Sequence, residues 1–331
     1  MQDVNGALPP PGLPVTHVRL LTKVARMYHE RGLRQPEIAR LLHMSQPRVS
    51  RLLKEAAEVG IVRTTVVAPR GTYADLEEQI ERRYGLAEVV VADTDGSTDE
   101  VEVLPAIAAA AAAYLETTLT GGDRIGISSW SSTLLATVDA MRPRPTQVAT
   151  KVVQILGGVG TTGAQTHATR LTGRLAQITG GEAVYLLAPG LLGSSTMRRA
   201  FLDEPNVAAV LREYQDLTLA LVGVGSLEPS TLLRESGNAI AQDDQEELRR
   251  ADAVGDICLR FFDSSGQHVR SDLDERVLGI APDTFRSIPR RVGVAGGQRK
   301  WGAIQAAVAG GWLTVLVTDL HTAQRLLLPT G

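Results

Sequence analysis

The sequence predicts an α/β protein in two parts, an N-terminal helix-turn-helix domain followed by a larger domain with a Rossmann-like, mostly parallel sheet. Two patterns predict this class: short helices near the N-terminus, and strands alternating with helices beyond residue 86. Charge divides the chain in the same way. Residues 1–70 hold eleven Lys and Arg against five acidic residues, a net charge of +6, whereas the remaining 23 basic and 32 acidic residues give −9. Such asymmetry is typical of a basic DNA-binding segment attached to an acidic body.

Composition limits the alternatives. The chain has 331 residues, of which 44% are hydrophobic and only 4% aromatic, so its core must be aliphatic. No apolar run reaches the length of about 18 residues needed to cross a membrane, and the N-terminus lacks the pattern of a signal peptide. The single cysteine, Cys258, excludes an intramolecular disulfide and a multi-cysteine metal site. We therefore expect a cytoplasmic protein with no membrane partner.

Three segments are expected. Residues 1–14 contain four prolines and are predicted to be a disordered tail. Residues 15–68 form the helix-turn-helix domain, and residues 69–331 form the larger domain, with Pro69-Arg70-Gly71 as the hinge.

The first two helices follow from apolar spacing. A helix starts at Val15 and ends at Gly32 as its C-cap, and a short helix, PEIARLL, follows with Pro36 in its first turn. The expected core positions are Val18, Leu21, Val24, Ala25, Tyr28, Ile38, Leu41 and Leu42.

The third helix, Ser45 to Val59, is predicted to read DNA. Ser45 is a suitable N-cap, and Val49, Leu52, Leu53 and Ala56 form an inner face. The first residues of the second helix of such a motif approach base edges in the major groove, where Arg matches guanine and Gln matches adenine. A three-helix bundle that merely packs remains an alternative, and IVRTTVVAP after Gly60 is predicted to be a wing strand. The candidate DNA-binding residues are Gln46, Pro47, Arg48, Ser50, Arg51 and Lys54.

The larger domain opens with an amphipathic helix, TYADLEEQIERRYG, and then alternates. The predicted strands are AEVVVAD, RIGIS, KVVQILGG, AVYLLAP, LTLALVGVGS, GDICLRFF, RVGVAGG and TVLVTD. The predicted helices are EVLPAIAAAAAAYLETTL, TLLATVDAM, ATRLTGRLAQITG, PSTLLRES, QEELRRA and KWGAIQAAVAG. This alternation predicts a mostly parallel sheet with helices on both faces.

Three strands end in small or glycine-rich turns. Ligands of such sheets bind at the carboxyl ends of the strands, and free backbone N–H groups at helix starts favour anions. Together with the cation of Lys300, the turns suggest a phosphorylated small molecule, although tight turns alone also require glycine, and no nucleotide-binding motif is present. The residues in these turns are Ser128, Ser129, Ser131, Ser132, Thr133, Gly157, Gly158, Gly160, Thr161, Thr162, Gly163, Gly296, Gly297 and Lys300.

An enzyme is the main competing interpretation. Its candidate catalysts would be Asp256, Asp263, His167 and Lys300, with Lys300 or Lys151 able to form a Schiff base. No compact acid–base pair is visible in the sequence, so no catalytic residue is assigned. A protein that binds only other proteins would leave the glycine-rich turns unexplained. The six histidines are scattered without metal-ligand spacing, so neither a metal nor a cofactor is expected.

Long motifs support a more specific identification. These are QPEIARLLHMSQPRVSRLLKEAAEVGIV, GISSWSST, QILGGVG followed by HATRLTGRLA, GDICLRFFDSSG, and IPRRVGVAGGQRKWGAIQAAVAGGWLTVLVTDLHTA. In order and spacing they resemble the SorC family of sugar-responsive bacterial transcriptional regulators, sometimes grouped with DeoR, over nearly the whole chain. The chain departs from many relatives in reading GISSWSS for GxSWG and Asp319-Leu320 for an Asp-Glu pair.

The resemblance implies a regulator of carbohydrate genes that binds double-stranded operator DNA under the control of a phosphorylated sugar or polyol. It implies a phosphosugar-binding domain of the glucosamine-6-phosphate deaminase and ribose-5-phosphate isomerase type that assembles dimers or tetramers. The Ser/Thr of GISSWSST and the GGVGTT loop would line the pocket, and Gly296, Gly297 and Lys300 would hold the phosphate or sugar, with Asp256 and Arg260 nearby. The implied effector-binding residues are Ser129, Ser131, Ser132, Thr133, Gly157, Gly158, Gly160, Thr161, Thr162, Asp256, Arg260, Gly296, Gly297 and Lys300.

Overall fold

The computed structural model describes residues 13–62, 72–228, 233–234 and 240–328, and it divides into two compact units between Pro69 and Arg70. The predicted N-terminal tail up to residue 12, the wing strand beyond Val62, the hinge and most of the PSTLLRES helix lie outside the described residues.

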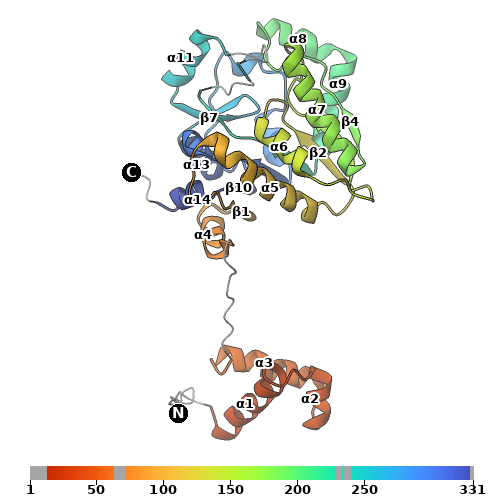
Figure 1. Cartoon of the computed structure of the whole chain (residues 1–331), viewed down its shortest axis with the longest axis vertical. Coiled ribbons are helices and arrows are strands. Elements are labelled where there is room, and N and C mark those ends of the chain that lie inside the picture. The colour runs from red at the N-terminus through yellow and green to blue at the C-terminus, as the bar shows by residue number, and fades with distance from the viewer. Residues whose placement is uncertain (1–12, 63–71, 229–232, 235–239, 329–331) are drawn as a thin grey trace. The chain divides into compact units, whose positions relative to one another are not determined.

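The described part of the N-terminal unit, residues 13–62, contains three helices (Figure 1), α1 (Val15–His29), α2 (Gln35–Leu41) and α3 (Gln46–Glu58). They enclose a small aliphatic core of Leu21, Val24, Ala25, Met27, Ile38, Ala39, Val49, Leu52 and Ala56. Two predicted core positions are wrong, because Leu41 is 55% exposed and Tyr28 is 38% exposed. Each lies at the edge of its helix's apolar stripe, where helical spacing alone cannot fix the orientation.

The turn between α2 and α3 is closed by a backbone bond from Met44 N–H to the Ala39 carbonyl, 2.9 Å, with His43 at φ +50°. Ser45 occupies the predicted N-cap position of α3 in an extended conformation, but its side chain makes no capping hydrogen bond. His17 Nε2 on α1 lies 2.7 Å from Glu55 Oε1 on α3 and joins the two helices.

The larger unit is built on a seven-stranded sheet in the order β1-β10-β9-β5-β2-β3-β4, and every neighbouring pair in it is parallel. This confirms the predicted mostly parallel α/β class. The strands are β1 (Glu88–Ala92), β2 (Asp123–Ile127), β3 (Ala149–Gln154), β4 (Glu182–Val184), β5 (Leu219–Val222), β9 (Arg290–Val294) and β10 (Val315–Asp319).

Helices cover both faces of this sheet, because successive side chains of its central strands are buried on opposite sides. On β5, Leu219 and Leu221 belong to the core of one face, and Ala220 and Val222 to the core of the other. The first face is covered by α5 (Glu100–Thr118), α6 (Ser132–Ala140) and α7 (Thr162–Thr179). Elements contributing to the core on the second face include α4 (Ala74–Tyr84), α9 (Pro205–Glu213), α11 (Gln242–Arg250), α12 (Pro282–Ser287), α13 (Trp301–Ala309) and α14 (Leu320–Leu326), and α8 (Ser195–Asp203) packs beside α9.

A second, three-stranded antiparallel sheet corrects the strand prediction. The segments LTLALVGVGS and GDICLRFF each divide, giving β6 (Gly225–Ser226) after β5 and a hairpin of β7 (Ala253–Ile257) and β8 (Arg260–Asp263). Cys258 and Leu259 form the hairpin turn with φ values of +55° and +59°. Neither residue carries the Asn-Gly signature of such turns, so the reversal could not be predicted from the turn residues.

Within the described residues, α5 is the one helix that is long and apolar enough to pass a membrane-span test based on length and composition. Its buried side chains, such as Val103, Ile107 and Leu115, belong to the core on the first face of the sheet. The helix therefore packs as part of the α/β domain (Figure 1).

Candidate functional site

The outward face of α3 carries the predicted DNA-binding side chains together. Gln46, Pro47, Arg48, Ser50, Arg51 and Lys54 are all exposed, whereas Val49 and Leu52 on the other side are buried. Arg51 Nε donates to the Pro47 carbonyl at 3.4 Å, and Lys54 lies 3.8 Å from Glu58. An ion pair this exposed contributes little, so Lys54 remains able to contact phosphate. The face is thus basic and uncovered at the end of the helix that would enter the major groove.

The second candidate site is a cleft at the carboxyl edge of the large sheet, between the ends of β2 and β5. These strands are neighbours, but the chain leaves β2 for β3 on one side and β5 for β9 on the other. Parallel sheets bind ligands at such a switch point, because the two following loops diverge there. The cleft offers about 660 Å³ of free space, its open mouth included. Its lining comprises Glu100, Ser128, Trp130, Ser131, Ser132, Thr133, Leu156, Gly223, Val224, Gly225, Ser226, Glu228, Leu233, Asp256, Cys258, Leu259, Arg299 and Lys300.

One wall of the cleft is formed by the start of α6. The Ser131 side chain caps this helix by accepting from Leu134 N–H at 3.2 Å. For the N–H groups of Ser132 and Thr133 the described residues supply no acceptor. Two free donors at a helix N-terminus, with a hydroxyl on each residue, can bind an anion.

The facing wall carries two cations and a carboxylate. Lys300 Nζ lies 2.8 Å from Glu100 Oε1, and Arg299 Nη2 lies 2.6 Å from Glu100 Oε2. Burial alone would raise the pKa of the Glu100 carboxyl, but Lys300 and Arg299 outweigh it and the pKa is lowered. Glu100 is therefore ionised at neutral pH, and the cleft contains a charged triad.

The β7–β8 hairpin closes the cleft. Asp256 Oδ2 accepts from Leu259 N–H at 2.9 Å and so holds the hairpin turn. Burial raises the pKa of Asp256 to about 6, against the opposing effects of that hydrogen bond and of Lys300. Burial likewise raises the pKa of the Cys258 thiol to about 12, so this cysteine is protonated at neutral pH and is a poor nucleophile.

The GGVGTT loop after β3 is placed differently from expectation. None of its residues that were predicted to bind effector lines the cleft. Only Leu156, directly before the loop in sequence, belongs to the lining. The N–H groups of Gly157 and Gly158 donate to the Leu278 and Leu186 carbonyls. A side chain at Gly157 would collide with the backbone of Pro189. Close packing therefore accounts for both glycines, while Gly160, Thr161 and Thr162 lead into α7 at the protein surface.

The turn after β9 supports the cations rather than presenting free donors. Gly297 N–H donates to Asp319 Oδ2 at 2.9 Å, and a Cβ at Gly296 would approach that carboxylate to 2.3 Å. Asp319 is fully buried and also caps α14 by accepting from Thr322 N–H. Ser129 is also turned inward, since its hydroxyl donates to the Leu156 carbonyl at 2.6 Å. Gly296, Gly297 and Ser129 thus lie behind the cleft surface.

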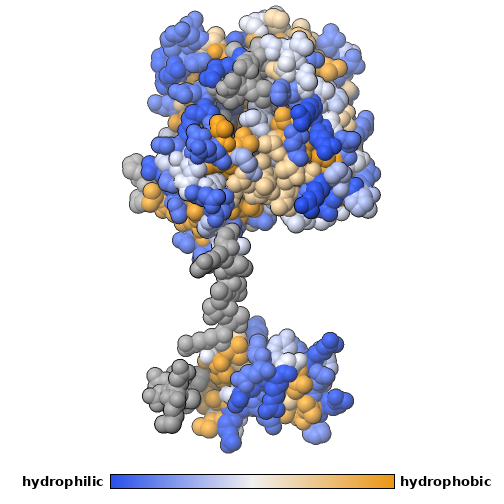
Figure 2. All heavy atoms as spheres, viewed as in Figure 1, coloured by the Kyte–Doolittle hydropathy of each residue, from blue (hydrophilic) through white to orange (hydrophobic). Residues whose placement is uncertain are grey.

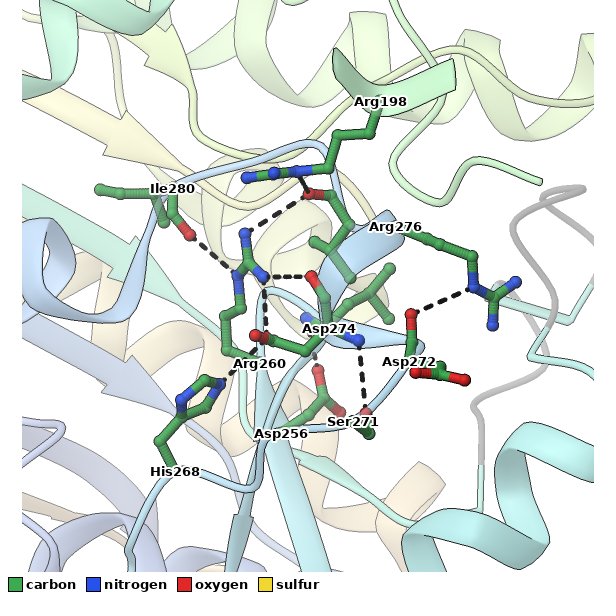
Figure 3. Close-up of polar contacts among 11 residues, drawn as sticks. Arg198, Asp256, Arg260, His268, Ser271, Asp272, Asp274, Arg276 and Ile280 are labelled. Carbon is green, nitrogen blue, oxygen red and sulfur yellow. Dashed lines mark hydrogen bonds and ion pairs between the residues drawn. The ribbon is translucent and has the colours of Figure 1, made fainter. Parts of the chain in front are cut away.

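Arg260 points away from the cleft, into a buried polar network (Figure 3). Its guanidinium donates to Asp274 Oδ1 at 2.8 Å and to the carbonyls of Asp274 and Ile280, and Asp274 also bonds His268 Nε2 at 2.9 Å. With 4% of its side chain exposed, Arg260 is occupied in joining β8 to the segment 274–280. The prediction that it reaches the ligand does not agree with this geometry.

The side chains considered for catalysis do not assemble. Lys151 lies near the amino end of β3, 2.6 Å from Glu213, while Asp263 holds the turn at Ser265 and His167 is exposed on α7. Only Asp256 and Lys300 reach the cleft. In the described part of the chain, no three His, Cys, Asp or Glu side chains form a group that could hold a metal.

Sequence reasoning missed several residues of the cleft. Gly223, Gly225 and Ser226 follow β5 directly, and their small-residue pattern could have been read as a fourth turn. Glu100 follows β1 after a seven-residue loop, and no motif marks it. The hairpin residues Cys258 and Leu259 became visible only once the antiparallel sheet was known.

These two sites define a class of protein, a DNA-binding head joined to a ligand-binding α/β domain. Comparison with known proteins agrees. A family model of a sugar-binding domain matches residues 69–328, and a helix-turn-helix model matches residues 15–59. The sorbitol operon regulator of Klebsiella pneumoniae is 31% identical over 94% of this chain and 98% of its own length. The deoxyribonucleoside regulator of Bacillus subtilis (strain 168) is 29% identical over 93% and 97%.

Solved structures give the same result. The full-length sorbitol operon regulator SorC from Klebsiella pneumoniae superimposes with a TM-score of 0.71 at 30% identity, covering 94% of this chain and 99% of that one. The sugar-binding domain of a DeoR transcriptional regulator from Pseudomonas syringae pv. tomato is 39% identical with a TM-score of 0.62, over 78% and 100%. The chain belongs to the SorC family of sugar-responsive transcriptional regulators. Its function is the regulation of transcription rather than catalysis, with DNA and a sugar as its partners.

Proposed function

We propose that the cleft binds a phosphorylated sugar or polyol and that this effector controls the affinity of the α3 face for operator DNA. The observation that carries the proposal is that one cleft combines two kinds of group. Hydrogen-bond donors and cations can bind an anion, and acceptors can bind the hydroxyl groups of a ligand. The free N–H groups at the start of α6 and the cations Lys300 and Arg299 suit a phosphate. Asp256 and the Ser226 hydroxyl suit sugar hydroxyls.

Within this proposal, five of the fourteen expected effector-binding residues act at the ligand surface: Ser131, Ser132, Thr133, Asp256 and Lys300. Glu100, Gly225, Ser226 and Arg299 join them. The other nine would act by supporting the surrounding loops: Ser129, Gly157, Gly158, Gly160, Thr161, Thr162, Gly296, Gly297 and Arg260.

A binding screen tests the proposal. A ligand that prefers the native state raises its stability, so the effector should raise the melting temperature of the full chain. We would compare sorbitol 6-phosphate, deoxyribose 5-phosphate and other sugar phosphates with the same sugars without phosphate. At least one phosphorylated compound should stabilise the wild type, its parent sugar much less, and Lys300→Ala should remove the effect. An equal response of wild type and variant would exclude the cleft, and sustained turnover of a sugar phosphate would contradict a purely regulatory role.

For the DNA site we propose that Gln46, Arg48, Ser50 and Arg51 contact base edges, while Pro47 shapes the helix start and Lys54 contacts phosphate. This is supported by their common exposure on one face of α3 and by the helix-turn-helix match. Since its partner is DNA, the protein would act in the cytoplasm.

We also propose a homo-oligomer, a dimer or tetramer. Paired heads would match paired half-sites on DNA. Exposed apolar residues support it, since Leu187 is 74% exposed beside Phe201 and Val207, and Val101 on α5 is 78% exposed. Orange and light orange areas of the larger unit in Figure 2 show that apolar residues reach its surface. Light scattering on the eluting protein should give a multiple of 35.4 kDa, and Leu187→Glu should lower it. A wild type that elutes as a monomer would contradict this.

A further inference from the structure

Glu100 holds the position in the cleft that an anionic ligand would need. As the first residue of α5, it pairs with both cations of this wall, 2.8 Å from Lys300 and 2.6 Å from Arg299. Arg299 is further fixed by Ser226 Oγ and the Glu228 carbonyl, each at 2.9 Å. The two cations are thus paired with an internal carboxylate.

The carboxylate and a phosphate cannot share these partners without cost. Lys300 and Glu100 side chains are only 11% and 30% exposed, so water screens their charges weakly. A phosphate bound to Lys300 would stand next to ionised Glu100, and like charges at that distance repel. Binding therefore favours a rearrangement in which Glu100 leaves the cations.

Glu100 is linked to the start of the larger unit by one short loop. Residues 93–99 connect β1 to α5, and Gln298 N–H, next to Arg299, donates to the Thr98 carbonyl at 2.9 Å. At the other end of the loop, Asp93 Oδ2 accepts from the Tyr73 hydroxyl at 2.8 Å. Tyr73 is the N-cap residue of α4, the first described helix of this unit after the head. The loop is therefore bonded to the cleft at one end and to α4 at the other.

We propose that Glu100 is an internal competitor of the effector, and that its displacement from Lys300 and Arg299 moves the 93–99 loop and, through Asp93 and Tyr73, α4. This rests on the proposed function and adds to it a residue that sets effector affinity and a route from the cleft toward the head. A carboxylate that only stabilises the folded cleft would make the opposite prediction for affinity, because its loss would loosen the anion site.

The first test is Glu100→Gln, which keeps the shape of the side chain and removes its charge. The full-length variant and wild type would be titrated at constant ionic strength with inorganic phosphate and with the sugar phosphate that binds wild type most tightly. We expect Glu100→Gln to bind both about fivefold to tenfold more tightly, since a factor of ten corresponds to about 1.4 kcal/mol. Glu116→Gln, at the far end of α5, makes the same charge change away from the cleft and should bind as wild type does.

The outcomes separate the two proposals. If wild type binds sugar phosphate, Lys300→Ala does not, and Glu100→Gln binds equally or more weakly, competition by Glu100 is wrong while the proposed function stands. If no sugar phosphate binds wild type, the proposed function itself is contradicted. A tighter Glu100→Gln with an unchanged Glu116→Gln supports the competitor role.

The second test addresses the route to α4. Tyr73→Phe removes only the hydroxyl that bonds Asp93 and should fold like wild type, because that hydroxyl is at the surface. We expect the effector to change DNA affinity at least about threefold less in Tyr73→Phe than in wild type, a loss of coupling in the range that single contacts produce. If the effector changed DNA affinity by the same factor in Tyr73→Phe as in wild type, transmission through Asp93 and Tyr73 would be contradicted.

Discussion

Asp256 is a cleft carboxyl whose ionisation is shifted by burial. Its pKa is raised by burial to about 6, so the folded protein binds this proton more readily than the unfolded chain, where the value is 3.8. Below about pH 4 the Asp256 carboxyl is protonated in both the folded and the unfolded state, so it does not change the free energy of unfolding. As pH rises through about 6, the folded state must hold a buried charge, and stability is lost.

Asp256→Asn should therefore raise the free energy of unfolding at pH 8 by about 1–2 kcal/mol and leave it nearly unchanged at pH 4. Urea titrations at the two pH values measure this. Asp263→Asn is the matched control of opposite sign, because hydrogen bonds from Ser265 and its neighbours lower the pKa of Asp263. An Asp256→Asn effect of the same size at both pH values would contradict the burial of its charge.

Arg260 shows why a polar residue in a family motif need not touch the ligand. Its guanidinium joins β8 to the segment 274–280 (Figure 3), where the Asp274 carboxylate contacts both Arg260 and His268. Removing one member of a buried ion pair leaves the other charge unpaired. In this chain Arg260 therefore supports the cleft hairpin.

Arg260→Ala should accordingly lower the free energy of unfolding by about 3–5 kcal/mol. Arg270→Ala, at an exposed arginine between β8 and the segment 274–280, should change it by less than about 0.5 kcal/mol. A stable Arg260→Ala variant that had lost effector binding would instead place Arg260 at the ligand.

Among the elements, α3 is where sequence and structure agree best. Its inner and outer faces follow from helical spacing, so the six candidate DNA-binding residues could be named from the sequence. The parallel strands were also predictable, because buried apolar runs alternate with helices. The β7–β8 hairpin was not, because Cys258 and Leu259 adopt left-handed turn conformations that are held by Asp256 rather than by glycine.

The cleft was predictable only in part, because some of its residues depend on loop conformations that no sequence pattern marks. The loops after β2 and β9 were identified correctly as lying at one edge of the sheet, and they bring Ser131 and Lys300 together. The glycines after β3 looked equivalent in sequence to those of the other turns, yet Gly157 is required by close packing against Ala188 and Pro189, and Gly158 by close packing against the Gln154 side chain. Glu100 depends on how a loop folds, which no spacing rule captures.

At the α3 face we predict different effects for two cations. Arg48→Ala should cost about 1–3 kcal/mol on a preferred site and relax preference at one base position, whereas Lys54→Ala should weaken all sites alike and lower the salt dependence by about one phosphate contact. Selection of bound duplexes from a randomised pool, followed by salt titrations, distinguishes the two. If both variants kept wild-type preference and salt dependence, α3 would not be the reading helix.

At the scale of the whole molecule, regulation requires that the two units communicate. The effector must favour one arrangement of the protein over another, and the bias must reach the heads. In the larger unit, α4 is bonded to two elements that adjoin segments of the cleft: Tyr84 bonds the Leu326 carbonyl on α14, and Glu77 accepts from Val91 on β1. β1 leads through the 93–99 loop to Glu100, and α14 is bonded through Thr322 to Trp301, next to Lys300. A ligand in the cleft is thus positioned to act on the start of its own domain.

The most direct test of this account measures one coupling factor from both sides. With a duplex selected from a randomised pool, DNA affinity is determined with and without the best sugar phosphate, and sugar-phosphate affinity with and without the duplex. Thermodynamic linkage requires the same factor in both experiments, typically about 5-fold to 150-fold. We predict equal factors within this range for the wild type, and a factor of one for Lys300→Ala. A sugar phosphate that binds the wild type in the cleft yet leaves DNA affinity unchanged would contradict the central claim.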